Sequence, residues 1–258
     1  MTAPVLLSLR EVTRHFGGLV AVDRLSFDVP EGGVFSVIGP NGAGKTTAFN
    51  LISGLVPLSS GELAFRGQAI AGAKPYHLAE LGLARTFQNI RLFGGATVWE
   101  NVAIAAALRA PTGFFQAMWR LSGFTESREA QEKAALEWLD FVGLVHLRNE
   151  LSRNLAYGQQ RRLEIARALA TKPSLLLLDE PAAGMNPRET EDLVALIGRI
   201  RELGLTVLLI EHDMPLVMRL SDRIAVMNFG QKIAEGTPAE VQAHPEVIRA
   251  YLGDGDEG

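Results

Sequence analysis

The sequence contains no cysteine, so neither a disulfide framework nor a thiolate metal site is available to this chain. Long apolar runs are missing too. Stretches such as 102–108 and 175–178 fall well short of the roughly 20 residues that a membrane-spanning helix needs. The first residues show no basic segment followed by an apolar run, so no secretory signal is indicated. Any role at a membrane is therefore expected to depend on a partner.

A strong charge of either sign is also absent. The formal net charge is −4 over 258 residues, which gives no electrostatic basis for binding nucleic acid. Hydrophobic residues make up 47% of the chain, as is typical of a globular protein. The length suits one large α/β domain, with or without a subdomain. We therefore expect a single domain over 1–258.

The hydrophobic pattern predicts two kinds of strand. Alternating apolar and polar residues predict antiparallel strands within 5–32 and 61–67. Residues 33–38 read as a buried strand that leads directly into a glycine-rich loop. Segments 175–178 and 206–210 are apolar throughout, as parallel strands covered on both faces are. These features predict a mainly parallel sheet with an additional antiparallel edge sheet.

Helices are predicted between these strands. A short helix is expected over 45–52, and apolar residues at three- and four-residue spacing predict a mostly helical segment over 89–170. A further helix is expected over about 187–203, and a hairpin around 229–230. We interpret 89–170 as a helical subdomain within an α/β domain.

Residues 39–47 read Gly-Pro-Asn-Gly-Ala-Gly-Lys-Thr-Thr, which matches the phosphate-binding pattern GxxxxGK[ST] between a strand and a helix. Glycines let backbone N–H groups approach a β-phosphate, Lys45 carries a charge to the β- and γ-phosphates, and the Thr46 hydroxyl ligates Mg²⁺. The nucleotide-binding residues expected here are Gly39, Asn41, Gly42, Gly44, Lys45, Thr46 and Thr47. The loop alone does not distinguish kinases, GTPases and motor ATPases.

Two carboxylates follow the apolar strand at 175–178. Asp179 is expected to bind Mg²⁺ through water beside the phosphate loop. Glu180 is expected to orient, and to deprotonate, the attacking water. The alternative is a solvated acidic turn at the end of a strand. The accompanying phosphate loop favours the catalytic interpretation.

Residues 155–169 read Leu-Ala-Tyr-Gly-Gln-Gln-Arg-Arg-Leu-Glu-Ile-Ala-Arg-Ala-Leu. A Gly-Gln turn here opens a helix, and a helix N-terminus favours an anion. With this stretch, the phosphate loop, Asp179-Glu180 and His212, the chain resembles the ATP-binding subunits of ABC transporters over essentially its whole length. The resemblance implies an ABC ATPase fold that binds ATP and Mg²⁺.

In that family, the signature turn of one subunit contacts the γ-phosphate held by the loop of another. The resemblance therefore assigns nucleotide contacts to Ala156, Tyr157, Gly158 and Gln159. The usual signature is Leu-Ser-Gly-Gly-Gln, so Ala156 removes one hydroxyl donor and Tyr157 replaces a glycine. A second departure is Asn186, where the family's D-loop ends in aspartate.

Three single residues acquire roles only through the resemblance. Phe16 resembles the aromatic residue that stacks on adenine, although a lone Phe is more often core. Gln88 resembles the glutamine that joins the active site, as a catalytic residue and Mg²⁺ ligand, to the membrane subunit. His212 resembles the histidine that hydrogen-bonds the γ-phosphate, although a lone His after a strand is usually a packed residue.

The residues of the signature stretch resemble those of one branch of the ABC family, the branch that imports branched-chain (hydrophobic) amino acids. The partners implied are a second ATP-binding subunit, two membrane permease subunits and an extracytoplasmic solute-binding protein, with no nucleic acid. This chain would then be peripheral, on the cytoplasmic face of the cell membrane, where ATP hydrolysis would power uptake. No residue here is expected to touch the solute.

Alternatives remain at this point. The first alternative is the same ATPase role for another solute, such as urea or a lipid, and only the partners can discriminate between them. A soluble ABC-type ATPase of translation or DNA repair would normally carry two cassettes or a long coiled-coil insertion, and a kinase or GTPase would lack the signature turn. An apolar insertion at 111–124 is expected to pack on the subdomain or to border the membrane subunit.

Overall fold

The computed structural model describes residues 3–107 and 123–252, with side chains of 3–107 and 132–251. Nearly all of the apolar insertion predicted at 111–124 lies outside these ranges. Among the described residues, we find no helix that combines the length and the apolar character needed to cross a membrane.

Four antiparallel strands form the first sheet, in the order β2-β1-β4-β5. Their bounds are β1 (Val5–Phe16), β2 (Leu19–Pro30), β4 (Ser60–Phe65) and β5 (Gln68–Ala69). The long β1–β2 hairpin is joined by the tight Gly17–Gly18 turn, which brings Phe16 opposite Leu19. The antiparallel strands predicted from the alternating pattern are confirmed.

The second sheet has six strands in the order β10-β9-β3-β8-β7-β6. Their bounds are β3 (Gly33–Ile38), β6 (Leu83–Arg85), β7 (Leu175–Asp179), β8 (Thr206–Ile210), β9 (Arg223–Asn228) and β10 (Gln231–Gly236). All neighbours are parallel except the β9–β10 hairpin. Strand β6 was not predicted, because three residues are too few to display a period.

Alternate residues of the parallel strands point into two different cores. Leu175 and Leu177 face the core shared with the antiparallel sheet. Leu176 and Leu178 face the core shared with the helices on the other side. This arrangement explains why β7 and β8 contain almost only apolar residues, as strands buried on both faces must.

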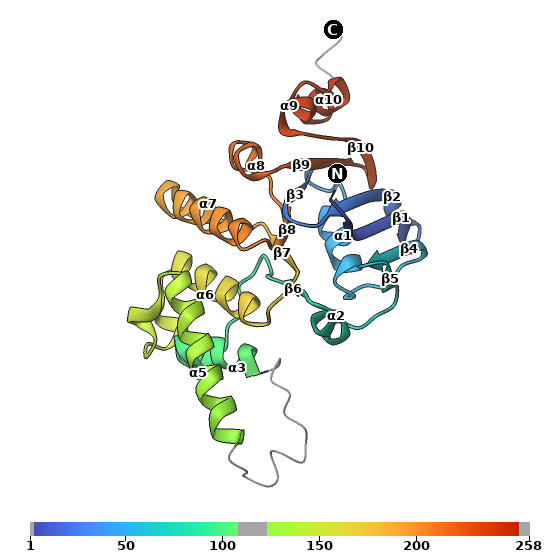
Figure 1. The fold of residues 1–258 in the computed structure, drawn as a ribbon. Helices are drawn as coiled ribbons and strands as arrows, with labels where there is room; N and C mark the ends of the chain where they lie inside the picture. Colours follow the sequence, from blue (N-terminus) through green and yellow to red (C-terminus); the bar gives the residue numbers. More distant parts are fainter. Residues whose placement is uncertain (1–2, 108–122, 253–258) are drawn as a thin grey trace.

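The helices lie on both sides of the six-stranded sheet (Figure 1). Their bounds are α1 (Lys45–Ile52), α2 (Pro75–Leu81), α3 (Val98–Ala107), α5 (Gly123–Phe141), α6 (Tyr157–Ala170), α7 (Pro187–Glu202), α8 (Met214–Leu220), α9 (Pro238–Gln242) and α10 (Pro245–Leu252), with short 3₁₀ helices η1 (Val145–Leu147) and η2 (Ser152–Asn154).

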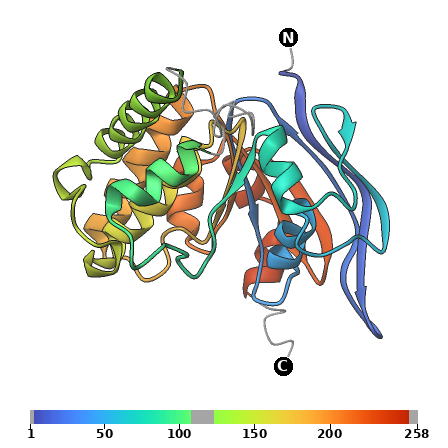
Figure 2. The ribbon, with the colours of Figure 1, turned by 90° about the horizontal axis from the view of Figure 1, so that it is seen from below.

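Figure 2 shows α3, α5 and α6 gathered on the side opposite the antiparallel sheet. The 86–97 connection joins β6 of the six-stranded sheet to α3 of this helical group. A short turn precedes α6.

Candidate nucleotide site

The phosphate loop connects β3 to α1 and is pressed against neighbouring backbone. Gly39 has φ +152°, and a Cβ there would lie 2.1 Å from the carbonyl oxygen of Met227. Gly44 has φ +96°, and a Cβ there would lie 2.4 Å from the carbonyl oxygen of Ala21. Only glycine fits both positions, so the loop shape depends on them.

Lys45 begins α1 and is almost fully buried, with 7% of its surface exposed. Its Nζ donates to the carbonyl oxygens of Gly39 at 2.7 Å and Pro40 at 2.9 Å. Burial lowers the pKa of Lys45, while the carboxylate of Glu180 acts in the opposite direction. These two hydrogen bonds hold the ammonium group of Lys45 within the phosphate loop.

A cavity of about 400 Å³ opens over the loop. It is lined by Leu19, Val20, Ala21, Asn41, Gly42, Ala43, Gly44, Lys45, Thr46, Thr47, Glu180, Phe229 and Gly230. The structure therefore brings Asn41, Gly42 and Gly44 through Thr47 together with Glu180.

Several predicted residues do not line this cavity, among them Gly39, Gln88, Asp179 and His212. Phe16 is 44% exposed at the end of β1, where the Arg14 guanidinium carbon lies 4.5 Å from its ring centroid. Residues 156–159 of the signature turn also lie elsewhere, at the start of α6. Phe229 does line the cavity and was missed, because a lone aromatic in a hairpin turn carries no sequence signal.

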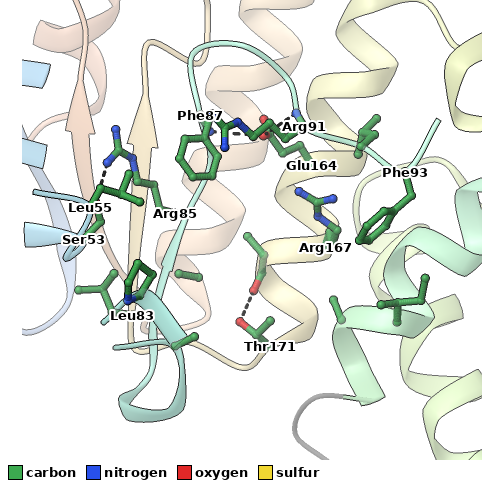
Figure 3. Close-up of a pocket in the computed structure, with 17 residues that line it drawn as sticks. Ser53, Leu55, Leu83, Arg85, Phe87, Arg91, Phe93, Glu164, Arg167 and Thr171 are labelled. Carbon is green, nitrogen blue, oxygen red and sulfur yellow. Dashed lines mark hydrogen bonds between the residues drawn. The ribbon is translucent and has the colours of Figure 1, made fainter. Parts of the chain in front are cut away.

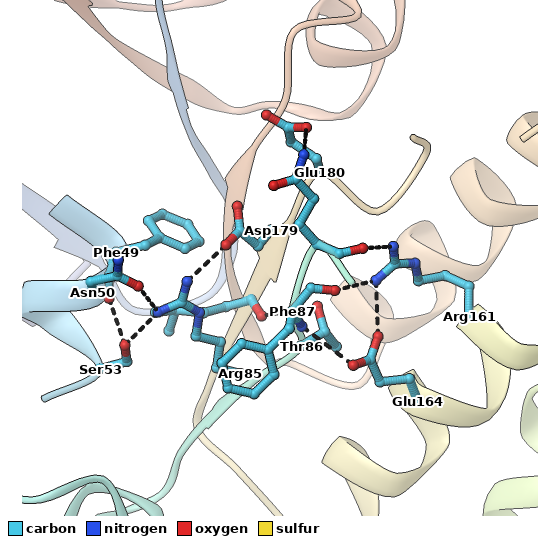
Figure 4. A network of polar contacts seen from close by, with 12 residues as sticks. Phe49, Asn50, Ser53, Arg85, Thr86, Phe87, Arg161, Glu164, Asp179 and Glu180 are labelled. Carbon is cyan, nitrogen blue, oxygen red and sulfur yellow. Dashed lines mark hydrogen bonds and ion pairs between the residues drawn. The ribbon is translucent and has the colours of Figure 1, made fainter. Parts of the chain in front are cut away.

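Asp179 ends β7 and faces a cation that the sequence did not reveal. Its Oδ2 accepts a hydrogen bond of 2.7 Å from Arg85 Nη2, and both side chains are almost fully buried. Arg85 also donates to Asn50 Oδ1 at 2.9 Å and to Ser53 Oγ at 2.6 Å (Figure 4). Because β6 had not been predicted, the proximity of Arg85 to β7 could not be predicted either.

Glu180 adopts a strained backbone conformation at the end of the same strand. Its φ is +44°, which is uncommon for a residue other than glycine, and its N–H donates to the Ile210 carbonyl at 2.9 Å. The carboxylate accepts a 2.9 Å hydrogen bond from Gln88 Nε2. His212 Nδ1 lies 3.9 Å from the Glu180 carboxylate. Glu180, Gln88 and His212, predicted from three separate segments, are therefore neighbours.

The residue before His212 is a buried carboxylate with a structural role. Glu211 is fully buried, and it accepts hydrogen bonds from Ala182 N at 2.8 Å and His212 N at 3.1 Å. Burial raises its pKa, and the two N–H donors lower it. It fixes the segment after Glu180 relative to His212, while the His212 side chain remains 59% exposed.

The signature turn is organised by its own helix and by α7. Ala156 N–H donates to Gln159 Oε1 at 3.1 Å, which caps α6 at its N-terminus. A Cβ on Gly158 would lie 2.6 Å from Glu189 Oε1, so α7 packs closely against this glycine. The Tyr157 ring lies beside Gly184, where a Cβ would approach it to 3.5 Å. Tyr157 thus occupies the contact between the turn and the 182–185 loop.

Within the described part of the chain, no three His, Cys, Asp or Glu side chains are grouped closely enough to hold a metal ion by themselves. Thr46, Asp179 and Gln88 nevertheless offer hydroxyl, carboxylate and amide oxygens, which are the donors that Mg²⁺ prefers. Such a set, completed by phosphate oxygens and water, fits a nucleotide-bound Mg²⁺.

Residues 22–183 match the ABC transporter family, which is more than half of the chain. The chain belongs to the ABC transporter ATP-binding family. It is therefore an ATPase with the ABC ATPase fold, as the resemblance implied. Residues 231–257 match a second family, described as the branched-chain amino acid ATP-binding cassette transporter.

Relatives of this ABC ATPase match it from end to end. It is 48% identical to the high-affinity branched-chain amino acid transport ATP-binding protein BraF of Pseudomonas aeruginosa, over 98% of this chain and 100% of the relative. It is 45% identical to LivG of Escherichia coli (strain K12), a protein of the same description, over 96% of this chain and 98% of the relative.

Solved structures of ABC cassettes share the fold. A crystal structure of the ADP conformation of an ABC transporter cassette has a TM-score of 0.83 at 32% identity, covering 97% of this chain and 99% of that one. A dimeric cassette in a post-hydrolysis state with ADP and Pi has a TM-score of 0.76 at 26% identity, covering 90% and 99%.

Proposed function

We propose that this ATPase powers the uptake of branched-chain amino acids through partner permeases, at the cytoplasmic face of the membrane. The observation that carries the proposal is the full-length similarity to BraF and LivG, together with the separate C-terminal match over 231–257. The C-terminal match supports this branch of the family over an importer of urea or lipid. The solute itself is recognised by the permeases and by an extracytoplasmic binding protein.

We assign the roles within the site as follows. The loop N–H groups and Lys45 bind the phosphates, and Thr46, Asp179 and Gln88 hold Mg²⁺, which supplies charge neutralisation on the phosphate oxygens when bound. Glu180 orients the attacking water and accepts its proton, and the exposed imidazole of His212 binds the γ-phosphate. The 2.9 Å contact between Gln88 and Glu180 supports a common task for these two side chains.

A second ATP-binding subunit completes each site in this proposal. The signature residues 156–159 do not line the cavity over their own phosphate loop, yet the N-terminus of α6 is suited to an anion. A facing subunit would place this turn on the γ-phosphate of its partner. In this arrangement Gly158 N–H and the helix terminus donate, since Ala156 has no hydroxyl. We also propose that 89–170 is a helical subdomain within the single domain 1–258.

The 86–97 connection, which contains Gln88, is called the Gln88 segment below. An apolar cavity of about 520 Å³ lies beside it, between α2, α3 and α6 (Figure 3). Its lining includes Leu55, Phe93 and Ile104, which are large apolar side chains exposed by 47%, 51% and 46%. We propose that the permease docks here. The apolar lining fits an apolar segment, and Arg85 and Phe87 connect the cavity wall to the site.

Replacing Ile104 by aspartate is expected to weaken permease binding by roughly tenfold or more, because a carboxylate would be desolvated at the centre of the contact. Co-purification from membranes measures the effect. Leu203→Asp is the matched control, since Leu203 is 51% exposed at the end of α7 and does not line the cavity. Equal recovery of permease with both variants would place docking elsewhere.

Phe16 is proposed to stack on the adenine, since its exposed ring projects from the β1–β2 hairpin whose residues Leu19 and Val20 line the cavity. Phe16→Ala is expected to weaken ATP binding by roughly 1–3 kcal/mol, the magnitude of base–aromatic stacking. Titration with ATP and with GTP checks this, and both nucleotides should lose affinity because stacking needs only a π face. Unchanged affinity would leave Phe16 as a residue that supports Arg14.

Reconstitution with the permeases and binding protein tests the function as a whole. We expect ATP-dependent uptake of leucine, isoleucine and valine into vesicles, with ATPase activity stimulated by these solutes. Urea and lipid substrates serve as the comparison. Stimulation by either of these, without any by branched-chain amino acids, would refute the proposed substrate while retaining the ATPase.

A further inference from the structure

The backbone of the Gln88 segment is held by one fully buried arginine of α6. Arg161 Nη1 donates to the Phe87 carbonyl at 2.6 Å, and Nη2 donates to the Gln88 carbonyl at 2.8 Å (Figure 4). Two carbonyls of consecutive residues are thus bound by the two ends of one planar guanidinium. A fork of this kind fixes the peptide plane between them as well as its position.

The Glu164 carboxylate binds the same segment by accepting hydrogen bonds from backbone N–H groups of that segment. Its Oε2 accepts from Arg161 Nη1 at 2.9 Å, and its Oε1 accepts from Phe87 N and Arg91 N, each at 3.3 Å. Only 1% of Glu164 is exposed, so its burial raises its pKa while the Arg161 charge lowers it. Carbonyls and N–H groups of one loop are therefore bound by one ion pair.

Burying such a pair is unfavourable compared with apolar side chains of similar volume, because both ions lose their hydration. An apolar pair would fill the same space on α6. It would leave the Phe87 and Gln88 carbonyls without partners and free to shift. The geometry therefore suits a function of the pair in fixing this loop.

The pair also reaches the signature turn. Arg161 Nη2 lies 3.2 Å from the hydroxyl of Tyr157 and donates to it, while Gln88 Nε2 reaches Glu180 at 2.9 Å. A continuous chain of hydrogen bonds consequently runs from the signature turn, through Arg161 and the Gln88 backbone, to Glu180.

We propose that Arg161 and Glu164 are positioning residues for ATP hydrolysis, which couple the signature turn to Gln88 and Glu180 of the same chain. The proposal rests on the function proposed above. There, the signature turn serves the partner's ATP, whereas Gln88 and Glu180 act on the chain's own ATP. The Arg161–Glu164 pair then transmits occupancy of one site to the other, which gives cooperative hydrolysis.

Arg161→Lys tests the fork while keeping the charge opposite Glu164. A single ammonium cannot bind both carbonyls in the plane of a guanidinium, so Gln88 loses its fixed position. In the complex with its partner subunits, we expect kcat to fall roughly 10- to 100-fold, with the Kd for ATP unchanged and the Hill coefficient reduced toward about 1. If the pair only supported folding, Arg161→Lys would lower the Tm but would not lower kcat while leaving the Kd for ATP unchanged.

Tyr157→Phe tests the link to the signature turn without disturbing the core. Tyr157 is 41% exposed, and phenylalanine retains the ring beside Gly184 while losing the hydroxyl. The loss of one hydrogen bond should lower cooperativity and reduce kcat about threefold or more. This variant decides the question even where Arg161→Lys proves unstable.

Arg219→Lys is the matched control, because Arg219 makes a bidentate pair with Glu191 at the surface, away from the Gln88 segment. It should behave as wild type. If wild type hydrolyses ATP cooperatively and Tyr157→Phe does the same with unchanged kcat and Hill coefficient, the coupling proposal is overturned. If wild type neither hydrolyses ATP nor supports uptake, the proposed function fails instead.

Discussion

Glu180→Gln is expected to bind ATP normally and to hydrolyse it at least about 100-fold more slowly, on the magnitudes of general-base catalysis. A carboxylate accepts a proton from water, whereas the amide of the same shape does not. The structure strengthens this expectation, because Glu180 is held at φ +44° and contacts both Gln88 and His212. Strained backbone conformations of this kind are concentrated at active sites, where they fix the orientation of a functional side chain.

The same variant should accumulate a dimer of ATP-binding subunits when ATP is added. The substitution removes a negative charge from the closed interface, and without hydrolysis the two sites do not reopen. Turnover and ATP-dependent dimerisation are measured together, with the native partner subunit where one is needed. Wild-type turnover in Glu180→Gln would mean that another group accepts the proton.

Lys45→Ala is expected to lose ATP binding and the dimer together. The ammonium is the charged donor at the centre of the phosphate loop, and hydrogen bonds to charged groups are the strong ones, so affinity should fall roughly 10- to 100-fold. Removing the side chain also takes the Nζ donor away from the Gly39 and Pro40 carbonyls, which helps to hold the loop in shape.

Calorimetric titration with Mg·ATP measures this loss. Lys74→Ala is the control, since Lys74 is an exposed lysine ahead of α2 that does not line the loop cavity. Together the two site variants separate binding from chemistry, because Glu180→Gln keeps ATP and Lys45→Ala does not. Wild-type affinity in Lys45→Ala would remove the phosphate role from this residue.

Much of the fold could be predicted, because local patterns determine it. The alternation in β1 and β2 and the uninterrupted apolar β7 and β8 each follow from which faces of a strand are buried. The phosphate loop could be recognised without the fold, since the glycines at 39 and 44 and Lys45 stand in a fixed order between a strand and a helix.

Glu180 was assigned from its place after an apolar strand and from the accompanying phosphate loop, whereas Gln88 and His212 joined the site only through the family resemblance. The contacts of these three residues with one another came from the structure. Sequence order places them on three distant segments, and only the parallel pairing of β6, β7 and β8 brings the ends of those strands side by side. Side-chain distances such as 2.9 Å between Gln88 and Glu180 follow from this pairing, which no local pattern encodes.

The sequence by itself therefore determined the phosphate loop, most of the longer strands and the family. Only the tertiary structure decided what holds the site in place. Arg85 beneath Asp179 and Arg161 behind Gln88 look like ordinary surface arginines in the sequence, because burial of a charge leaves no periodic signal. A buried guanidinium is recognised only when its partners are known, and those partners lie on other elements of the fold.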